Sequence, residues 1–213
     1  MISKETLTIA TLLVLAFIFL RSLVVSLFRW LVIPRIGAIK TLLLPLSLRR
    51  FPLRPEVADD FPRRVLDLDW SKLEAVYGSA DRYQVPLHLI TLAQNRDFTH
   101  ASGELRIHLS HQDSFLTSAS AAALPFYLEL SRCRDDELVA DILYKLETFA
   151  FCTNPNHPSN ADRETFEEFE SKIYTALTEN IPYFQTLSKS TSGDVGYAAT
   201  SVIESLTKAE NAV

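Results

Sequence analysis

The sequence has few of the residues on which loop-rich and disulfide-bonded proteins depend. It contains five glycines, two cysteines and no Asn-x-Ser/Thr glycosylation site. A predicted helix separates Cys133 from Cys152, and about 19 residues of helix rise by roughly 28 Å, far beyond the reach of a disulfide. Hydrophobic residues make up 47% of the chain, which is too many for a disordered protein. These features exclude a small disulfide scaffold and favour a reducing compartment.

The sequence also lacks the short motifs that accompany common catalytic sites. It contains no P-loop and no G-x-G-x-x-G, G-x-S-x-G, H-E-x-x-H or C-x-x-C pattern. We therefore predict no cofactor and no bound metal. The absence of these motifs favours a non-enzymatic protein over an enzyme.

Opposite charges are concentrated in two parts of the chain. Residues 1–54 carry eight basic side chains against the single acid Glu5, a net charge of +7. The remaining residues carry 13 basic and 25 acidic side chains, a net charge of −12. A domain with this negative charge is repelled by nucleic acid, so we predict no nucleic-acid partner.

The run from Leu7 to Leu20 has no charged residue and predicts a membrane anchor. Alone it is too short to cross a hydrocarbon core of about 30 Å. If the helix continues to Phe28, it reaches about 33 Å, and Arg21 extends its guanidinium toward the lipid headgroups. We predict a short tail over residues 1–6 and a transmembrane helix over residues 7–33. A cleavable signal peptide fits less well because no A-x-A-like site follows, and a buried core helix would need a larger protein around it.

Basic residues after the anchor predict its orientation, because such residues resist translocation. The C-terminal domain is expected on the cytoplasmic side or an equivalent reducing compartment, in a single-pass protein. Residues 34–62 are predicted to be a basic interfacial segment and proline-rich connector, with an ordinary loop and solvated arginines as the alternative. The predicted membrane-interface residues are Arg21, Arg29, Trp30, Arg35, Lys40, Arg49 and Arg50, and Arg54 is expected to meet phosphates with the last two of them.

Residues 63–213 are predicted to form an acidic domain of the α+β class, mainly helical with a sheet of two or three strands. β-Formers and alternating apolar residues predict strands over residues 64–68, 85–93 and 104–110. Helical spacing predicts helices over residues 70–77, 113–130 with a kink or division at Pro125, and 135–151. A capping pair, Ser159 and Asp162, predicts a further helix through Leu177, and Asp194 is expected to cap a last one.

Candidate chemistry gathers between residues 94 and 111. Asp97, His100 and His108 are weak candidates for acid or base catalysis, and no partner nucleophile is indicated. A metal site that also uses Glu104 and His111 is disfavoured, because residues three apart on a strand point to opposite faces. Cys133 between two arginines is either a reactive thiol or, more in keeping with its place at a helix end, an inert residue.

An acidic run predicts a docking surface for a basic partner, with an ordinary solvated helix face as the alternative; its residues are Glu164, Glu167, Glu168 and Glu170. The leading hypothesis is a membrane-anchored, non-enzymatic interaction protein: a receptor, adaptor or accessory subunit whose partners are other membrane proteins or a basic protein segment. The alternative is a membrane-interface enzyme that acts on a lipid or lipid-linked substrate through residues 94–111. A third possibility is a structural subunit in which Arg21 pairs with an acid inside the membrane.

Overall fold

The computed structural model describes residues 47–111, 115–156, 160 and 167–207. The predicted tail and anchor, with Arg21, Arg29, Trp30, Arg35 and Lys40, lie outside the described residues, as do Asp113, Ser159, Asp162 and Glu164. Within the described part, no helix is both long enough and apolar enough to cross a membrane.

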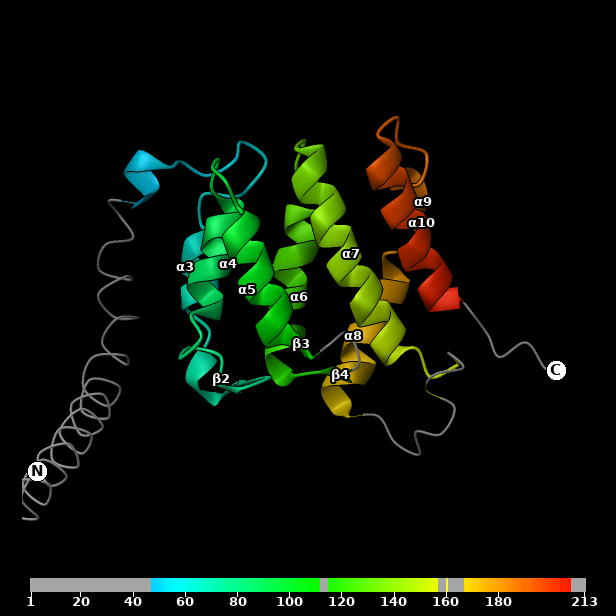
Figure 1. The fold of residues 1–213 in the computed structure, drawn as a ribbon, viewed down its shortest axis with the longest axis horizontal. Helices are drawn as coiled ribbons and strands as arrows, with labels where there is room; N and C mark the ends of the chain where they lie inside the picture. The colour runs from blue at the N-terminus through cyan, green and yellow to red at the C-terminus, as the bar shows by residue number, and fades with distance from the viewer. Residues whose placement is uncertain (1–46, 112–114, 157–159, 161–166, 208–213) are drawn as a thin grey trace, which may run out of the picture. The chain divides into compact units, whose positions relative to one another are not determined.

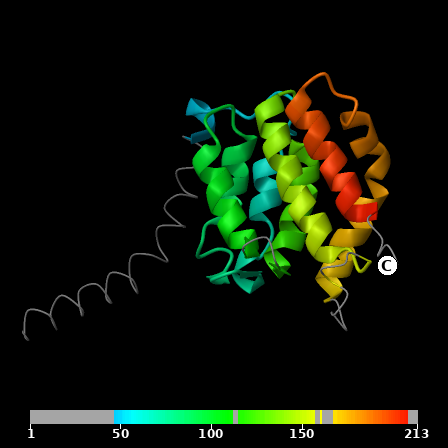
Figure 2. The same ribbon diagram turned by 45° about the vertical axis from the view of Figure 1, so that its right-hand side comes forward.

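The described domain is mainly helical, as predicted. Its principal helices are α3 (Phe61–Leu66), α4 (Val85–Ala93), α5 (Thr99–Leu109), α6 (Ser118–Leu130), α7 (Asp136–Thr153), α8 (Glu168–Glu179), α9 (Ile181–Leu187) and α10 (Gly193–Thr207). Figures 1 and 2 show α4, α5, α6, α7 and α10 side by side in one bundle. Helix α7 packs most extensively on α10 and also contacts α6 and α8, so it forms the centre of the core.

Two small antiparallel hairpins provide the strands at one end of the bundle. Strand β1 (Glu74–Ala75) pairs with β2 (Gly78–Ser79), and β3 (Ser110–His111) pairs with β4 (Phe115–Leu116). Figure 1 shows β2, β3 and β4 at the lower end of the helices. The prediction of a small sheet is therefore confirmed in kind, but its strands come from other residues.

The predicted strands over residues 85–93 and 104–110 are wrong, because residues 85–93 and 104–109 are helical and only Ser110 lies in a strand, β3. Pro86 lies in the first turn of α4. A backbone N–H in the first turn has no partner within the helix, so the missing N–H of proline costs no hydrogen bond there. In α5 the buried Leu105 and Leu109 are four residues apart, while Ile107 between them is 48% exposed. The alternating residue types had suggested a strand, but the burial follows the helical period.

Residues 64–77 also differ from prediction. Residues 64–66 belong to α3, which begins at Phe61 with Pro62 in its first turn. The predicted helix over residues 70–77 is a single 3-10 turn, Trp70–Lys72, followed by the β1–β2 hairpin. The indole Nε1 of Trp70 donates to the Val65 carbonyl at 2.6 Å, which holds this turn against α3.

Helix α6 continues through Pro125 as one helix, so the division into two helices, one of the two predicted outcomes, does not occur. It begins at Ser118, after a capping box in which Thr117 and Ser120 satisfy each other's backbone N–H groups. The predicted helix over residues 135–151 is confirmed as α7. The Asp135 side chain caps it by accepting from the Leu138 N–H at 3.2 Å.

The segment before α3 packs on the bundle. Leu53 forms a β-bridge with Gln94, and the Arg54 N–H donates to the Ala93 carbonyl at 2.8 Å. Arg54 is 6% exposed, and its guanidinium lies 2.5 Å from the Asp135 carboxylate. The expectation that Arg54 meets lipid phosphates or solvent is therefore wrong, whereas Arg49 and Arg50 are exposed.

Candidate functional site

The three weak catalytic candidates do not converge. Asp97 is exposed in the loop before α5, where it accepts from the Thr99 N–H at 2.9 Å, a bond that lowers the pKa of its carboxyl. His100 is exposed in the first turn of α5, with its ring edge to face with His88. His108 is buried eight residues later, and eight residues of helix rise by about 12 Å. Among the described residues, no group of three or more His, Cys, Asp or Glu side chains could hold a metal ion.

His108 is held by aromatic rings near the hairpins. Its ring stacks on Tyr83 with centroids 4.2 Å apart, and its Nε2 lies 3.4 Å from a Glu104 carboxylate oxygen. Burial lowers the pKa of His108, and the neighbouring Glu104 opposes that shift. Its buried Nδ1 has no hydrogen-bond partner in the described structure. This environment favours the neutral imidazole and gives His108 a structural place.

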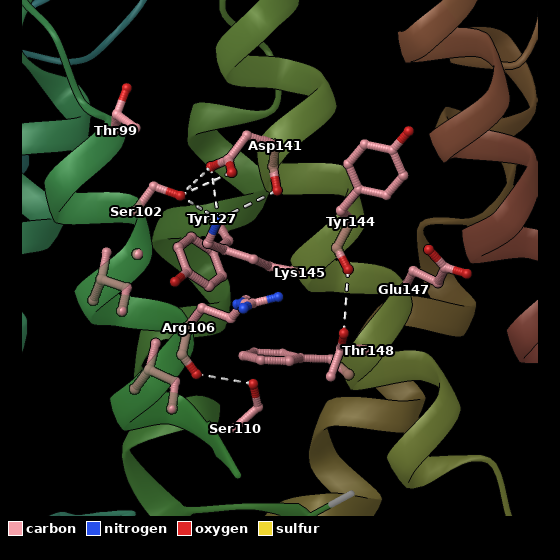
Figure 3. Close-up of a pocket in the computed structure, with 14 residues that line it drawn as sticks. Thr99, Ser102, Arg106, Ser110, Tyr127, Asp141, Tyr144, Lys145, Glu147 and Thr148 are labelled. Atoms are coloured by element: carbon pink, nitrogen blue, oxygen red, sulfur yellow. Dashed lines mark hydrogen bonds and ion pairs between the residues drawn. The ribbon is translucent and has the colours of Figure 1, made fainter. Parts of the chain in front are cut away.

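A half-open cavity of about 570 Å³ lies between α5 and α7, with Tyr127 of α6 in its wall (Figure 3). This volume is within the range of small-molecule sites. The polar lining comes mainly from Thr99, Ser102, Arg106, Ser110, Asp141, Tyr144, Lys145, Glu147 and Thr148. Its apolar part includes Leu105, Leu109 and Phe149, all nearly fully buried.

Ser102, Asp141 and Lys145 form a connected polar cluster at the inner wall of this cavity (Figure 3). Lys145 Nζ donates to Ser102 Oγ at 2.6 Å and lies 2.7 Å from Asp141 Oδ2. Ser102 Oγ in turn donates to the Asp141 carboxylate, with both oxygens 2.8 Å away. Ser102 and Lys145 are only 6% and 7% exposed, so the cluster is largely shielded from water.

Two opposing influences act on the pKa of Lys145. Burial lowers it, while the charge of Asp141 and the hydrogen bond to that carboxylate raise it; the net shift is downward. A buried titratable group with a perturbed pKa and a specific partner in a cleft is a reason to suspect a functional site.

Two further groups of the cavity wall have unused hydrogen-bonding capacity. The Tyr127 hydroxyl is completely buried and has no hydrogen-bond partner in the described structure. Burial, reinforced by the charge of Asp141, raises the pKa of that hydroxyl, so it stays protonated. Arg106 is exposed and forms no ion pair with any residue the structure describes.

Sequence reasoning did not find this cluster. The predicted strand over residues 104–110 begins after Ser102 and therefore does not include it. On a helix, Ser102, Leu105 and Leu109 share one face, which lines the cavity together with residues of α7. The available signal is the pair Asp141 and Lys145, two opposite charges four residues apart beside the apolar stripe of the predicted core helix.

Two of the described acidic residues at the start of α8 cap that helix. Glu167 is its N-cap and forms a capping box with Glu170, which is only 2% exposed. Glu168 is exposed and pairs with Lys172 at 2.6 Å. Glu167 and Glu168 are thus the exposed members of the predicted docking run among the residues that the structure describes.

A second surface combines apolar and acidic side chains at the hairpin end of the bundle. Tyr77, Ile107 and Phe115 are 56%, 48% and 44% exposed. The Val76 N–H donates to the His108 carbonyl, and Phe115 lies opposite His111 in the β3–β4 ladder, so both hairpins adjoin the end of α5. We call these three side chains, together with the nearby acids Glu74 and Glu104, the hairpin surface.

Cys133 lacks the properties of a reactive thiol. It is 8% exposed, and burial together with nearby carboxylates raises its pKa to about 11. Its neighbours Arg132 and Arg134 are exposed, and Arg132 lies over the Tyr183 ring at 4.8 Å. The interpretation of Cys133 as an inert residue at a helix end is the one the geometry supports.

Comparison of the chain with protein-family models, with curated proteins and with solved structures gave no match.

Proposed function

We propose that this chain is a single-pass membrane protein that binds a partner through the acidic domain it presents on the cytoplasmic side. The sequence supports the anchor through the apolar run of residues 7–33 and the basic residues that follow it. An anchored domain meets membrane-bound partners at a raised effective concentration, which favours a receptor, adaptor or accessory subunit.

The hairpin surface is the observation that carries this proposal. Its exposed Tyr77, Ile107 and Phe115 provide apolar contact area, and aromatic side chains are enriched in protein interfaces. Glu74 and Glu104 add negative charge, in keeping with the net charge of −12 after residue 54. A basic, amphipathic segment of another protein matches both properties.

The alternative of an enzyme acting through residues 94–111 receives no support from Asp97, His100 and His108. The first two are exposed and the third is buried about two helical turns away. Catalysis by a general acid or base needs a reacting group within hydrogen-bond reach, and the described positions of these three side chains do not converge on one point.

A peptide titration tests the proposal. The 213-residue chain in lipid nanodiscs should bind a basic amphipathic helical peptide at low salt and bind it more weakly at high salt. The variant with Tyr77→Ser and Ile107→Ser should lose about tenfold in affinity or more, as expected for truncated interface anchors. Tyr197→Ser is the matched control, since this tyrosine is 66% exposed on α10 and outside the hairpin surface.

Two results would contradict the proposal. One is the absence of peptide binding at both salt concentrations. The other is a mild-detergent purification or proximity-labelling experiment in cells that recovers no stoichiometric partner of the tagged chain.

A further inference from the structure

We propose that Ser102 is a nucleophile for acyl transfer, with Lys145 as its general base, in the cavity between α5 and α7. The substrate class is a carboxylic ester with an apolar acyl chain. This activity goes beyond partner binding at the hairpin surface and does not depend on it.

The geometry has the three parts that an activated serine requires. A nucleophile needs a base within about 2.6–3.2 Å, and the base needs a third group that orients it. Lys145 Nζ lies 2.6 Å from Ser102 Oγ, and Asp141 Oδ2 holds the same nitrogen at 2.7 Å (Figure 3). Helix α5 supplies the nucleophile, while one face of α7 supplies the base and its orienting carboxylate.

Transfer of the serine proton to Lys145 requires the neutral amine, with the Ser102 hydroxyl turned from Asp141 toward Nζ. Burial lowers the pKa of Lys145, which increases the fraction of neutral amine at a given pH. The Asp141 carboxylate stabilises the ammonium that forms when Nζ accepts a proton, in the way a triad carboxylate stabilises its charged base.

The reaction proceeds in two balanced steps. Ser102 Oγ attacks the ester carbonyl carbon, its proton passes to neutral Lys145, and the resulting ammonium protonates the departing alcohol oxygen. Water then attacks the acyl-serine carbonyl and gives one proton to Lys145, which returns it to Ser102 Oγ. Ester and water are consumed, and carboxylic acid and alcohol are formed.

The remaining wall of the cavity fits this substrate. Tyr127 places a buried, unpartnered hydroxyl in the same wall, and such a donor can stabilise the negative oxygen of a tetrahedral intermediate. Leaving a buried hydroxyl unpaired costs about 1–3 kcal/mol, which needs an explanation in a folded domain. Leu105, Leu109 and Phe149 offer an apolar lining for the acyl chain.

Active-site labelling tests the proposal directly. The 213-residue chain in detergent micelles is treated with an alkyl fluorophosphonate, and the modified residue is identified by mass spectrometry. Labelling is expected at Ser102, together with hydrolysis of p-nitrophenyl esters, and Ser102→Ala should abolish both. Ser131→Ala is the matched control, because Ser131 is also buried but lies outside the lining of this cavity, and its hydroxyl donates to the Leu128 carbonyl at 2.9 Å.

Lys145→Arg separates catalysis from structure. Arginine keeps a positive charge beside Asp141 but does not give up its proton, so it cannot act as a base. The variant should retain its thermal unfolding temperature within a few degrees and lose about 100-fold in ester hydrolysis, the usual contribution of a general base. If Lys145→Arg fails to fold, the same loss is required of Tyr127→Phe, which removes only a hydroxyl.

Failure to label Ser102 in the folded protein would overturn the proposal and make the cluster a structural clamp between α5 and α7. Equal ester hydrolysis by the Ser102→Ala variant would also overturn it. Neither result affects peptide binding at the hairpin surface, so the two proposals fail separately.

Discussion

Asp135 has two structural tasks that depend on one carboxylate. It caps α7 through the Leu138 N–H and neutralises Arg54, whose guanidinium is buried beneath the segment that precedes α3. Arg54 Nε also donates to the Leu92 carbonyl at 3.2 Å, so this arginine joins that segment to both α4 and α7. One residue therefore fixes a helix start and a long-range contact.

The Asp135→Ala variant should lose about 3 kcal/mol of unfolding free energy. Removal of one partner of a buried ion pair typically costs about 3–5 kcal/mol, and loss of a helix cap costs about 1 kcal/mol; the partial exposure of Asp135 reduces the sum. Asp136→Ala is the control, because Asp136 is exposed in the same turn, and it should change stability by about 0.5 kcal/mol or less. Denaturant unfolding of both variants measures the difference, and equal losses would contradict this role of Asp135.

His108 should make the domain sensitive to acid. Its pKa in the folded protein is lower than the ordinary value of 6.5, so the unfolded chain binds the proton more readily. The stabilisation is complete above about pH 6.5 and is lost as the pH falls from there to the folded pKa, by about 1.4 kcal/mol for each unit of difference.

Substitution of His108 tests this dependence. His108→Phe keeps a ring against Tyr83 but does not titrate, so its unfolding free energy should fall less than that of the wild type between neutral and mildly acidic pH. His100→Phe, at an exposed position on the same helix, should follow the wild type. Parallel stability curves for His108→Phe and the wild type would refute the role of His108.

At the scale of elements, two helical glycines differ in the space around them. A Cβ on Gly103 in α5 would meet no atom within 4 Å, whereas a Cβ on Gly196 in α10 would lie 3.3 Å from the Ser188 carbonyl oxygen. Gly103→Ala should therefore raise unfolding free energy by up to about 1 kcal/mol, the ordinary gain in a helix. Gly196→Ala should give no gain in unfolding free energy, because the backbone at Ser188, directly after α9, must move to make room for the new Cβ. Thermal unfolding measures both, and an equal gain at both positions would contradict this account.

The elements that the sequence predicted best are those whose apolar residues follow one period over several turns. Helix α7 satisfies this condition over 18 residues, and its prediction is confirmed. Helix α5 does not, because Leu105, Ile107 and Leu109 alternate in the sequence, and of these three apolar residues only the two leucines are buried. Residue type alone could not show that Ile107 faces solvent.

The same limit explains what was missed at the cavity. Its cluster joins Ser102 to residues about 40 positions later, and this contact depends on how α5 and α7 pack. The charges of Asp141 and Lys145 were visible in the sequence, but their partner was not. By contrast, the place of Cys133 at a helix end favours an inert thiol, and its burial agrees with that interpretation.

At the scale of the molecule, the chain divides into two parts of opposite net charge. The +7 of residues 1–54 suits an anionic membrane surface, and the −12 of the rest is repelled by it. The described arginines near the boundary between these two parts have different environments. Arg54 is neutralised inside the domain, whereas Arg49 and Arg50 are exposed. The two exposed arginines are therefore the ones available for lipid phosphates.

The predicted membrane anchor over residues 7–33 is tested by extraction of the membrane fraction. The tagged chain should remain in the membrane fraction after alkaline extraction, since a helix over residues 7–28 would be about 33 Å long and would be held by the hydrocarbon core. Replacing Leu13 and Leu15 with arginine should release it, because each arginine near the centre of a span costs about 2.5–3.5 kcal/mol. Leu42→Arg with Leu43→Arg lies outside the predicted span and should leave extraction unchanged.

The orientation is tested in sealed membrane vesicles whose cytoplasmic face is outward. Added protease should remove a fluorescent tag from the C-terminus and spare one at the N-terminus, because the basic residues after the anchor resist translocation. The opposite pattern would place the acidic domain across the membrane and contradict a cytoplasmic partner. Digestion of both tags, together with release by alkali, would show that the apolar run does not span, and binding at the hairpin surface would then have to proceed without a tether.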